Sequence, residues 1–317
     1  MKKQSIMKHI LRSQQFDRPA LEHMFSSTEE LSRLYQETTG TGRSMLRKSC
    51  EGKLLFAVFY EASTRTRFSF CSAAYHLGMG SIQTENAREF SSAVKGETLE
   101  DTIQVLCQYD PDIIVLRHHE IGGADRAAAL IDRLGYPVSI INAGDGKGQH
   151  PTQALLDLYT IKCELGRIDG LTVTVGGDLA NGRTARSLVY LLSKFQDVKF
   201  SFLSPTNLKM GEDIIRHLRE HDISFKETEN LEEALTYADI VYWTRVQSER
   251  GSINTTLNLS IRSSHMVCMK KDAILLHPLP RVDEIAREVD GDKRAAYFRQ
   301  VRNGMLVRMF LLRELCA

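Results

Sequence analysis

Short apolar runs alternate with amphipathic helical patterns along the whole chain. The runs typical of buried strands cover residues 54–60, 112–116, 138–141, 171–175, 199–203, 239–243 and 273–276. Between them lie helical stretches such as 185–195, where Leu188, Leu191, Leu192 and Phe195 share one face. Strands that alternate with helices predict an α/β fold, with parallel sheets covered by helices on both faces.

A break at His150 and Pro151 divides this pattern. Seven strands could form one sheet, but the break favours two doubly wound sheets. Pro151 suits the first turn of a helix over 152–165, because proline is tolerated where no helical hydrogen bond is needed. We therefore expect two domains with this helix running between them.

Composition excludes several classes of protein. The 317 residues are 42% apolar, enough for one large or two medium domains. The 41 basic and 40 acidic residues leave a net charge of +1, which argues against a nucleic-acid-binding surface. There is no run of about 18 apolar residues, so we expect no membrane span.

The cysteines and the first residues favour a cytoplasmic protein. The six cysteines are far apart and form no Cys-x-x-Cys pair: Cys50, Cys71, Cys107, Cys163, Cys268 and Cys316. That spacing predicts free thiols in a reducing compartment rather than a zinc site or a disulfide framework. The first twelve residues lack the apolar core of a signal peptide.

Polar residues follow six of the seven predicted strands. In open α/β sheets, ligands bind at the carboxyl ends of the strands. The basic and amide side chains in these segments include Arg65, Arg117, His150, Gln153, Arg183, Arg245, Gln247 and Arg281. Arginine binds carboxylate and phosphate with two parallel hydrogen bonds. The pattern indicates a functional cleft that binds more than one small anion.

The segment Glu61–Arg67 is the most specific of these. It opens a helix directly after a strand, where free N–H groups and the helix dipole attract anions. Ser63, Thr64 and Thr66 add hydroxyls and Arg65 adds a guanidinium, a combination that suits phosphate. The alternative is a strand-to-helix turn in which Ser63 or Thr64 is an ordinary N-cap.

The helix predicted after Arg67 has an apolar face and a glycine at its end. Phe68, Cys71 and Tyr75 share one face of the helix, and Gly78 supplies a stop.

Motifs for other chemistries are missing from the sequence. There is no P-loop, and Gly176–Gly182 does not fit the dinucleotide fingerprint. There is also no His-Glu-x-x-His and no Gly-x-Ser-x-Gly. We therefore expect no metal, no cofactor and no covalent nucleophile, and the residues suit direct transfer between two bound anions.

Several motifs resemble one enzyme family. Phe59–Arg67 resembles the carbamoyl-phosphate signature of the carbamoyltransferases, and His150–Asp157 and His277–Glu284 are similar to two further motifs of that family. Thr244–Gln247 and Leu276–Arg281 point to the aspartate branch, since ornithine enzymes typically carry a His-Cys-Leu-Pro motif. The match runs in order over nearly the whole chain. The sequence is thus similar to the catalytic chains of the aspartate carbamoyltransferases.

The resemblance implies a domain plan and a reaction. Residues 1–150 with 304–317 would form a carbamoyl-phosphate-binding domain, and 151–303 an aspartate-binding domain, with the active site in the cleft between them. The reaction would convert carbamoyl phosphate and L-aspartate to N-carbamoyl-L-aspartate and phosphate, an early step of pyrimidine biosynthesis. The alternatives are transfer to another amine and a non-catalytic scaffold chain.

The resemblance also implies roles for individual residues. The residues for carbamoyl phosphate would be Ser63, Thr64, Arg65, Thr66, Ser91, Lys95, Arg117, His150, Gln153, Leu279 and Pro280. Those for aspartate would be Lys95, Arg183, Arg245 and Gln247. The catalytic ones would be Arg65, Thr66, Lys95, Arg117 and His150. Glu61 would pair with Arg183 and Arg250 on domain closure.

Two histidines also have structural readings. His150 could simply cap the helix that begins at Pro151. His277 could be a core histidine whose hydrogen bonds are all satisfied.

The loop 91–98 carries an expectation about assembly. By itself it is a small-residue loop in which Lys95 would be solvated. In the family this loop reaches the neighbouring subunit's site, so Ser91 and Lys95 imply a homotrimer with shared active sites, to which regulatory chains could add. Val94 and Ala180-Asn181 depart from the residues that are common in the family.

Overall fold

The computed structural model describes residues 7–90, 92–245 and 259–317. The chain divides into two compact units. The first domain comprises Met1–Thr152 and Asn303–Ala317, and the second comprises Gln153–Arg302. No helix in the described ranges is long and apolar enough to cross a membrane.

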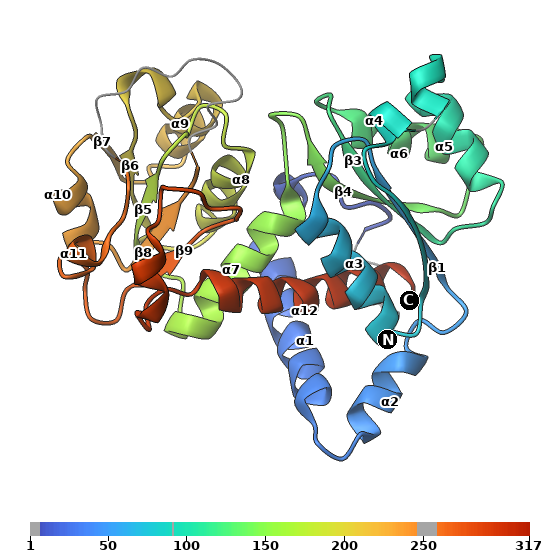
Figure 1. The fold of residues 1–317 in the computed structure, drawn as a ribbon, viewed down its shortest axis with the longest axis horizontal. Helices are drawn as coiled ribbons and strands as arrows, with labels where there is room; N and C mark the ends of the chain where they lie inside the picture. Colours follow the sequence, from blue (N-terminus) through green and yellow to red (C-terminus); the bar gives the residue numbers. More distant parts are fainter. Residues whose placement is uncertain (1–6, 91, 246–258) are drawn as a thin grey trace. The chain divides into compact units, whose positions relative to one another are not determined.

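The first domain is built on a four-stranded parallel sheet with strand order β2-β1-β3-β4 (Figure 1). Its strands are β1 (Leu54–Phe59), β2 (Gly80–Thr84), β3 (Ile113–His118) and β4 (Ser139–Asp145). Its helices are α1 (Arg18–Gln36), α2 (Thr41–Lys48), α3 (Thr64–His76), α4 (Ala87–Phe90), α5 (Leu99–Cys107) and α6 (Gly123–Leu134), with short turns η1 (Ser13–Gln15) and η2 (Ser92–Lys95).

The central strands of this sheet are buried on both faces. Phe56 and Ile114 pack in one core cluster with Ile103 of α5 and Ile131 of α6. Leu55, whose side chain points to the opposite face, is also fully buried. Burial on two sides explains why these strands read as continuous apolar runs rather than as alternating ones.

The second domain is built on a five-stranded parallel sheet with strand order β7-β6-β5-β8-β9. Its strands are β5 (Thr172–Gly176), β6 (Lys199–Leu203), β7 (Phe225–Thr228), β8 (Ile240–Trp243) and β9 (Ile274–Leu276). Its helices are α8 (Arg183–Leu192), α9 (Glu212–Glu220), α10 (Leu231–Thr236) and α11 (Ser263–Met266), with short turns η3 (Thr206–Leu208) and η5 (Arg287–Gly291). In Figure 1, α8 lies on one side of this sheet and α10 and α11 on the other.

Two helices cross the division between the domains. They are α7 (Pro151–Leu165) and α12 (Tyr297–Leu315). The start of α7 at Pro151 confirms the predicted helix and its proline in the first turn.

All seven predicted strands are present, and the prediction of two parallel sheets is confirmed. Strands β2 and β7, the edge strands at one end of each sheet, were not predicted from the sequence. Most residues of β2 are exposed and β7 has no buried residue, so neither strand shows an apolar run. Strand β4 also runs further than predicted, through Asn142 to Asp145.

One apolar face of helix α3 is turned away from the core. The face formed by Phe68, Cys71 and Tyr75 lies outside, with Phe68 and Tyr75 54% and 61% exposed. The buried side chains of the helix are instead Thr66, Phe70, Ala73 and Ala74. The stop is confirmed, because the helix ends at His76 and Gly78 has a φ of +78°.

Candidate active site

The amino end of α3 forms the first part of the site. Ser63 occupies the N-cap position, but its hydroxyl makes no capping hydrogen bond. Its N–H donates to the Glu85 carboxylate at 3.1 Å. Thr64 and Arg65 are exposed, whereas Thr66 is buried. The Ser63 side chain therefore does not act as an ordinary N-cap. The hydroxyls and the guanidinium at the first turn of α3 are groups of the kind that bind an anion.

Glu85 is a structural residue of the site that was not predicted from the sequence. It follows the edge strand β2 and accepts hydrogen bonds from both Ser63 N–H and the Arg67 guanidinium. The pair of contacts ties the start of α3 to β2. Glu85 was not identifiable beforehand, because β2 itself has no apolar pattern that marks it as a strand.

Arg117 lies at the carboxyl end of β3, next to the end of β1. Its Nη1 donates to the Ala143 carbonyl at 3.2 Å, and its Nη2 lies 3.6 Å from the Glu61 carboxylate. Its own carbonyl accepts the Tyr60 N–H at 2.8 Å. In this domain, Glu61 thus pairs with Arg117. The pairing of Glu61 with Arg183 and Arg250 stays a prediction, and Arg250 lies outside the described residues.

His118, the next residue along β3, is buried and neutral at physiological pH. Burial, and then the neighbouring His119, lower the pKa of His118 to about 4. Its Nδ1 accepts the Glu120 N–H at 3.1 Å, and its ring packs edge-on against Tyr60 with centroids 4.8 Å apart. The side chain therefore shapes this edge of the sheet by packing and hydrogen bonding rather than by charge.

A hydrogen-bonded loop leads from β4 to His150. The buried carboxylate of Asp145 accepts the N–H groups of Gly122 at 2.9 Å and Gln149 at 2.5 Å. His150, which follows, is itself buried. Asp145 therefore determines the path of the loop that delivers His150, a role that the sequence did not reveal.

In the second domain, two arginines follow neighbouring strands. Arg183 begins α8 after β5, and Arg245 follows β8, which pairs with β5. Thr244 holds the two strand ends together, because its N–H and its hydroxyl both donate to the Gly176 carbonyl, at 2.8 and 3.0 Å. Both half-buried arginines thus belong to the same carboxyl edge. Gln247 and, in the first domain, Ser91 lie outside the described residues.

The amide of Gln153 has a defined orientation. Its Nε2 donates to the Asp157 carboxylate at 2.8 Å. A carboxylate can only accept, so the nitrogen must face Asp157 and the carbonyl Oε1 faces the other way. Gln153 can therefore accept a hydrogen bond from a ligand amino group.

The loop after β9 contains Leu279 and Pro280, joined by a cis peptide bond. The Nδ1 atom of His277 accepts the Leu279 N–H at 2.7 Å, so Nε2 carries the proton and donates to Glu284 at 2.9 Å. His277 is buried. Of its two readings, the satisfied core histidine is confirmed, and its hydrogen bond holds the Leu279 backbone in place.

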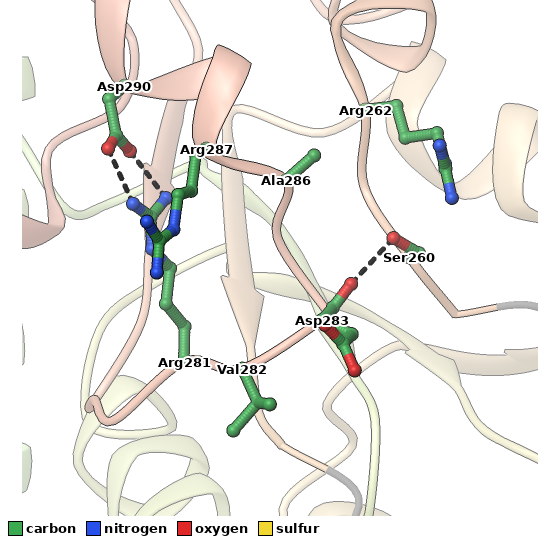
Figure 2. Close-up of a pocket in the computed structure, with 8 residues that line it drawn as sticks. All are labelled: Ser260, Arg262, Arg281, Val282, Asp283, Ala286, Arg287 and Asp290. Carbon is green, nitrogen blue, oxygen red and sulfur yellow. Dashed lines mark hydrogen bonds and ion pairs between the residues drawn. The ribbon is translucent and has the colours of Figure 1, made fainter.

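A separate pocket of about 890 Å³ opens in the second domain (Figure 2). It is lined by Ser260, Arg262, Arg281, Val282, Asp283, Ala286, Arg287 and Asp290. Figure 2 shows Arg281 and Arg287 beside Asp290, with Arg262 on the opposite side. The Arg281 guanidinium is engaged by Asp290 and Tyr297, and it lowers the pKa of the Asp290 carboxyl. Arg281 therefore acts within this internal network.

Within the described ranges, no group of three or more histidine, cysteine, aspartate and glutamate side chains is placed to hold a metal ion. The polar groups described above are hydrogen-bond donors and acceptors.

Comparison with known proteins decides the family. The model of the "Aspartate/ornithine carbamoyltransferase, carbamoyl-P binding domain" matches residues 8–163, and that of the "Asp/Orn binding domain" matches residues 169–315. The chain belongs to the aspartate/ornithine carbamoyltransferase family. Both halves of the carbamoyltransferase fold are therefore present.

Individual relatives lie in the aspartate branch. The chain is 48% identical to the chloroplastic aspartate carbamoyltransferase of Oryza sativa subsp. japonica, over 96% of this chain and 84% of the relative. It is similar in structure to the Trypanosoma cruzi aspartate transcarbamoylase in complex with carbamoyl aspartate and phosphate, with a TM-score of 0.87, 35% identity and coverage of 97% and 95%. The catalytic subunit from Methanocaldococcus jannaschii superposes with a TM-score of 0.86 at 41% identity, covering 98% of each chain.

Proposed function

We propose that this carbamoyltransferase acts on carbamoyl phosphate and L-aspartate and forms N-carbamoyl-L-aspartate and phosphate, an early step of pyrimidine biosynthesis. The observation that carries the proposal is the amino end of α3, where the Ser63 hydroxyl makes no capping bond and Arg65 is exposed beside it. Relatives named for this reaction share almost the full length of the chain.

Carbamoyl phosphate binds through its phosphate to the first turn of α3. Ser63, Thr64 and Thr66 supply hydroxyls, Arg65 supplies a charged donor, and the helix dipole favours the negative charge. Glu85 supports this by holding Ser63 N–H and Arg67, which keeps the turn in place.

The carbonyl of the carbamoyl group is polarised by Arg117, His150 and Thr66. The guanidinium of Arg117 is already oriented by the Ala143 carbonyl and the Glu61 carboxylate. Donors fixed before the reaction stabilise the oxyanion that forms when the amine attacks. The departing phosphate accepts the proton of the amine, so no protein base is required.

Aspartate binds through its two carboxylates. Arg183 and Arg245, at the ends of two neighbouring strands, supply guanidinium groups for them, with Gln247 as a third partner. A second substrate amine, as in ornithine, would call for a protein carboxylate instead. The alternative of transfer to a diamine is therefore disfavoured by this pair of arginines.

The active unit is a homotrimer in which Ser91 and Lys95 complete a neighbouring chain's site. Lys95 is exposed on the short turn η2, as such a role requires. Apolar side chains also lie exposed on α3 and on the edge strand β2, where Phe68, Tyr75 and Ile82 are 54%, 61% and 60% exposed. Such exposed apolar surface is available for a contact between chains. Regulatory chains and a cytoplasmic location stay predictions.

Phosphate release and ureido-product formation, measured with L-aspartate and with L-ornithine side by side, test the reaction. We expect turnover with aspartate alone. Replacing Arg65 by alanine should lower turnover about 10²–10³-fold, because a charged donor to the phosphate leaving group is lost. The exposed Arg133 on α6 offers the matched control, since Arg133→Ala should leave turnover unchanged.

Two results would contradict the proposal in different ways. Turnover with ornithine would assign the chain to the other acceptor. A wild-type protein that binds carbamoyl phosphate and turns over neither amine would point to another acceptor or to an absent partner chain.

A further inference from the structure

A completely buried carboxylate, Asp157 on α7, lies at the centre of a polar network in the second domain. Three side chains donate to it. The Gln153 and Gln300 amide nitrogens reach Oδ1 at 2.8 and 2.5 Å, and the Tyr242 hydroxyl reaches Oδ2 at 2.8 Å. An ionised carboxylate can only accept hydrogen bonds, so each of its partners must turn a donor toward it.

Tyr242 keeps its proton and remains a donor. It is fully buried, and burial together with the charge of Asp157 raises its pKa well above 10. Its bond to Oδ2 fixes the plane of the carboxylate, which leaves Oδ1 for the two glutamines.

The first arm of the network ends at Gln153. Its nitrogen is held by Asp157, so its Oε1 atom is the group that it offers to a ligand. A freely rotating amide would present oxygen or nitrogen with similar ease. Asp157 removes that ambiguity.

The second arm ends at the Leu279 backbone. Gln300 turns its Oε1 to the His277 N–H at 3.1 Å, because its nitrogen faces Asp157. The His277 ring then accepts the Leu279 N–H, and Glu284 holds the other side of the ring. With its N–H engaged, Leu279 can offer only its carbonyl oxygen to a ligand.

We propose that Asp157 is a positioning residue that makes Gln153 Oε1 and the Leu279 carbonyl the acceptors for the amino group of carbamoyl phosphate. The inference rests on the proposed function. An NH₂ group carries two N–H donors and is best matched by two acceptors. The network therefore discriminates the carbamoyl group from an acyl group of the same shape that carries a methyl in place of NH₂.

Asp157→Asn tests the proposal, because it keeps the shape of the side chain but adds a donor. Gln153 can then turn its oxygen inward and its nitrogen outward. We expect carbamoyl phosphate to bind about tenfold more weakly, the loss of about one hydrogen bond. Acetyl phosphate, which lacks the NH₂ group, should bind as it does to the wild type. Titration calorimetry without L-aspartate measures both dissociation constants.

The matched control is Asp239→Asn in the same domain. Asp239 also accepts a backbone N–H and a side-chain nitrogen, from Thr172 and Lys270, each at 2.8 Å. It lies at the amino end of β8, away from the carboxyl edge that carries the ligand groups. This variant should leave both dissociation constants unchanged.

A double-mutant cycle separates positioning from folding. Gln153→Ala should weaken carbamoyl phosphate binding, and adding Asp157→Asn to it should cost less than in the wild type, because one arm is already lost. Tyr242→Phe is the second variant if Asp157→Asn does not fold, and it should shift the same ligand preference in the same direction, by a smaller factor.

Equal weakening of both ligands by Asp157→Asn, or full additivity with Gln153→Ala, would overturn the proposal in favour of a purely structural role. The wild type is assayed first. Its failure to turn over carbamoyl phosphate and aspartate would overturn the proposed function itself, whereas an active wild type with an unaffected Asp157→Asn variant would overturn only the positioning role.

Discussion

His118 illustrates how burial sets the chemistry of a single residue. It lies beside Arg117 at the end of β3, where a charged imidazole would add to the local positive charge, but burial lowers its pKa to about 4. Gln153 and His277 show the same principle for hydrogen bonding, since a neighbouring group settles which atom of each side chain donates. The charge and the hydrogen-bonding role of a site residue thus depend on its neighbours as much as on its residue type.

The lowered pKa of His118 predicts a dependence of stability on pH. Between the unfolded value of 6.5 and about 4, the unfolded chain binds a proton that folded His118 does not. The free energy of unfolding must therefore fall as the pH falls through this window, by about 3 kcal/mol in total. Urea unfolding of wild type and His118→Asn at pH 7.5, 5.5 and 4.5 measures this, since asparagine can still accept the Glu120 N–H.

The wild type should lose about 2–3 kcal/mol more than His118→Asn between pH 7.5 and 4.5. If the free energy of unfolding fell equally with pH in the two proteins, His118 would not contribute to the loss of stability at low pH.

The ends of helix α3 follow from local sequence signals, whereas the orientation of its faces depends on packing. Its start carries the proposed phosphate contacts, and its end is formed by Gly78, which packs against α2. The sequence predicted both ends, because a polar N-terminal turn and a glycine stop are local signals. It did not show that Phe68 and Tyr75 lie outside, since the apolar spacing alone does not say which face meets the sheet.

Gly78→Ala should destabilise the protein for two reasons. A Cβ at this position would lie 1.8 Å from the Arg47 carbonyl oxygen of α2, and the φ of +78° disfavours any L side chain. We expect a loss of about 2–4 kcal/mol in the free energy of unfolding. Gly52→Ala is the matched control, because Gly52 has a φ of +79° with no atom within 4 Å of an added Cβ.

The control should lose only about 1 kcal/mol, the cost of the left-handed backbone. Urea unfolding of the two variants gives the comparison. Equal losses would mean that the contact with α2 does not restrict this turn.

On the scale of the whole molecule, each domain presents its own set of groups at the carboxyl edge of a parallel sheet. The first carries Arg65, Arg117 and His150, and the second carries Arg183 and Arg245. Lys95 belongs to the first domain by sequence, but the proposed trimer assigns its side chain to a neighbouring chain.

Subunit mixing tests this assignment. Arg65→Ala and Lys95→Ala should each be almost inactive, and co-assembly of equal amounts should restore activity at about one quarter of the sites in a symmetric trimer. Mixing Arg65→Ala with Arg117→Ala should restore nothing, because these two arginines would serve the same chain's site. The active species should have about three times the 35.9 kDa chain mass by light scattering.

An inactive mixture of Arg65→Ala and Lys95→Ala, in a protein that does co-assemble, would place Lys95 outside a shared site. Activity in the Arg65→Ala and Arg117→Ala mixture would contradict the assignment of those two residues to one chain.

Local sequence patterns were enough to predict the alternation of strands and helices, the two parallel sheets and the residue types at the strand ends. These follow from local patterns, because a strand buried on both faces must be apolar and a helix start or stop requires particular residues. The family motifs are also local, and they predicted the reaction and the residues proposed for it.

The folded chain was needed to identify the edge strands β2 and β7, the outward face of α3, and the roles of Glu85, Asp145 and Asp157. Edge strands are exposed, so burial imposes no apolar pattern on them. The three carboxylates act through hydrogen bonds to residues distant in sequence, such as the bond from Gln300 to Asp157 across 143 positions. Such partners meet only when the chain has folded, and no local pattern records them.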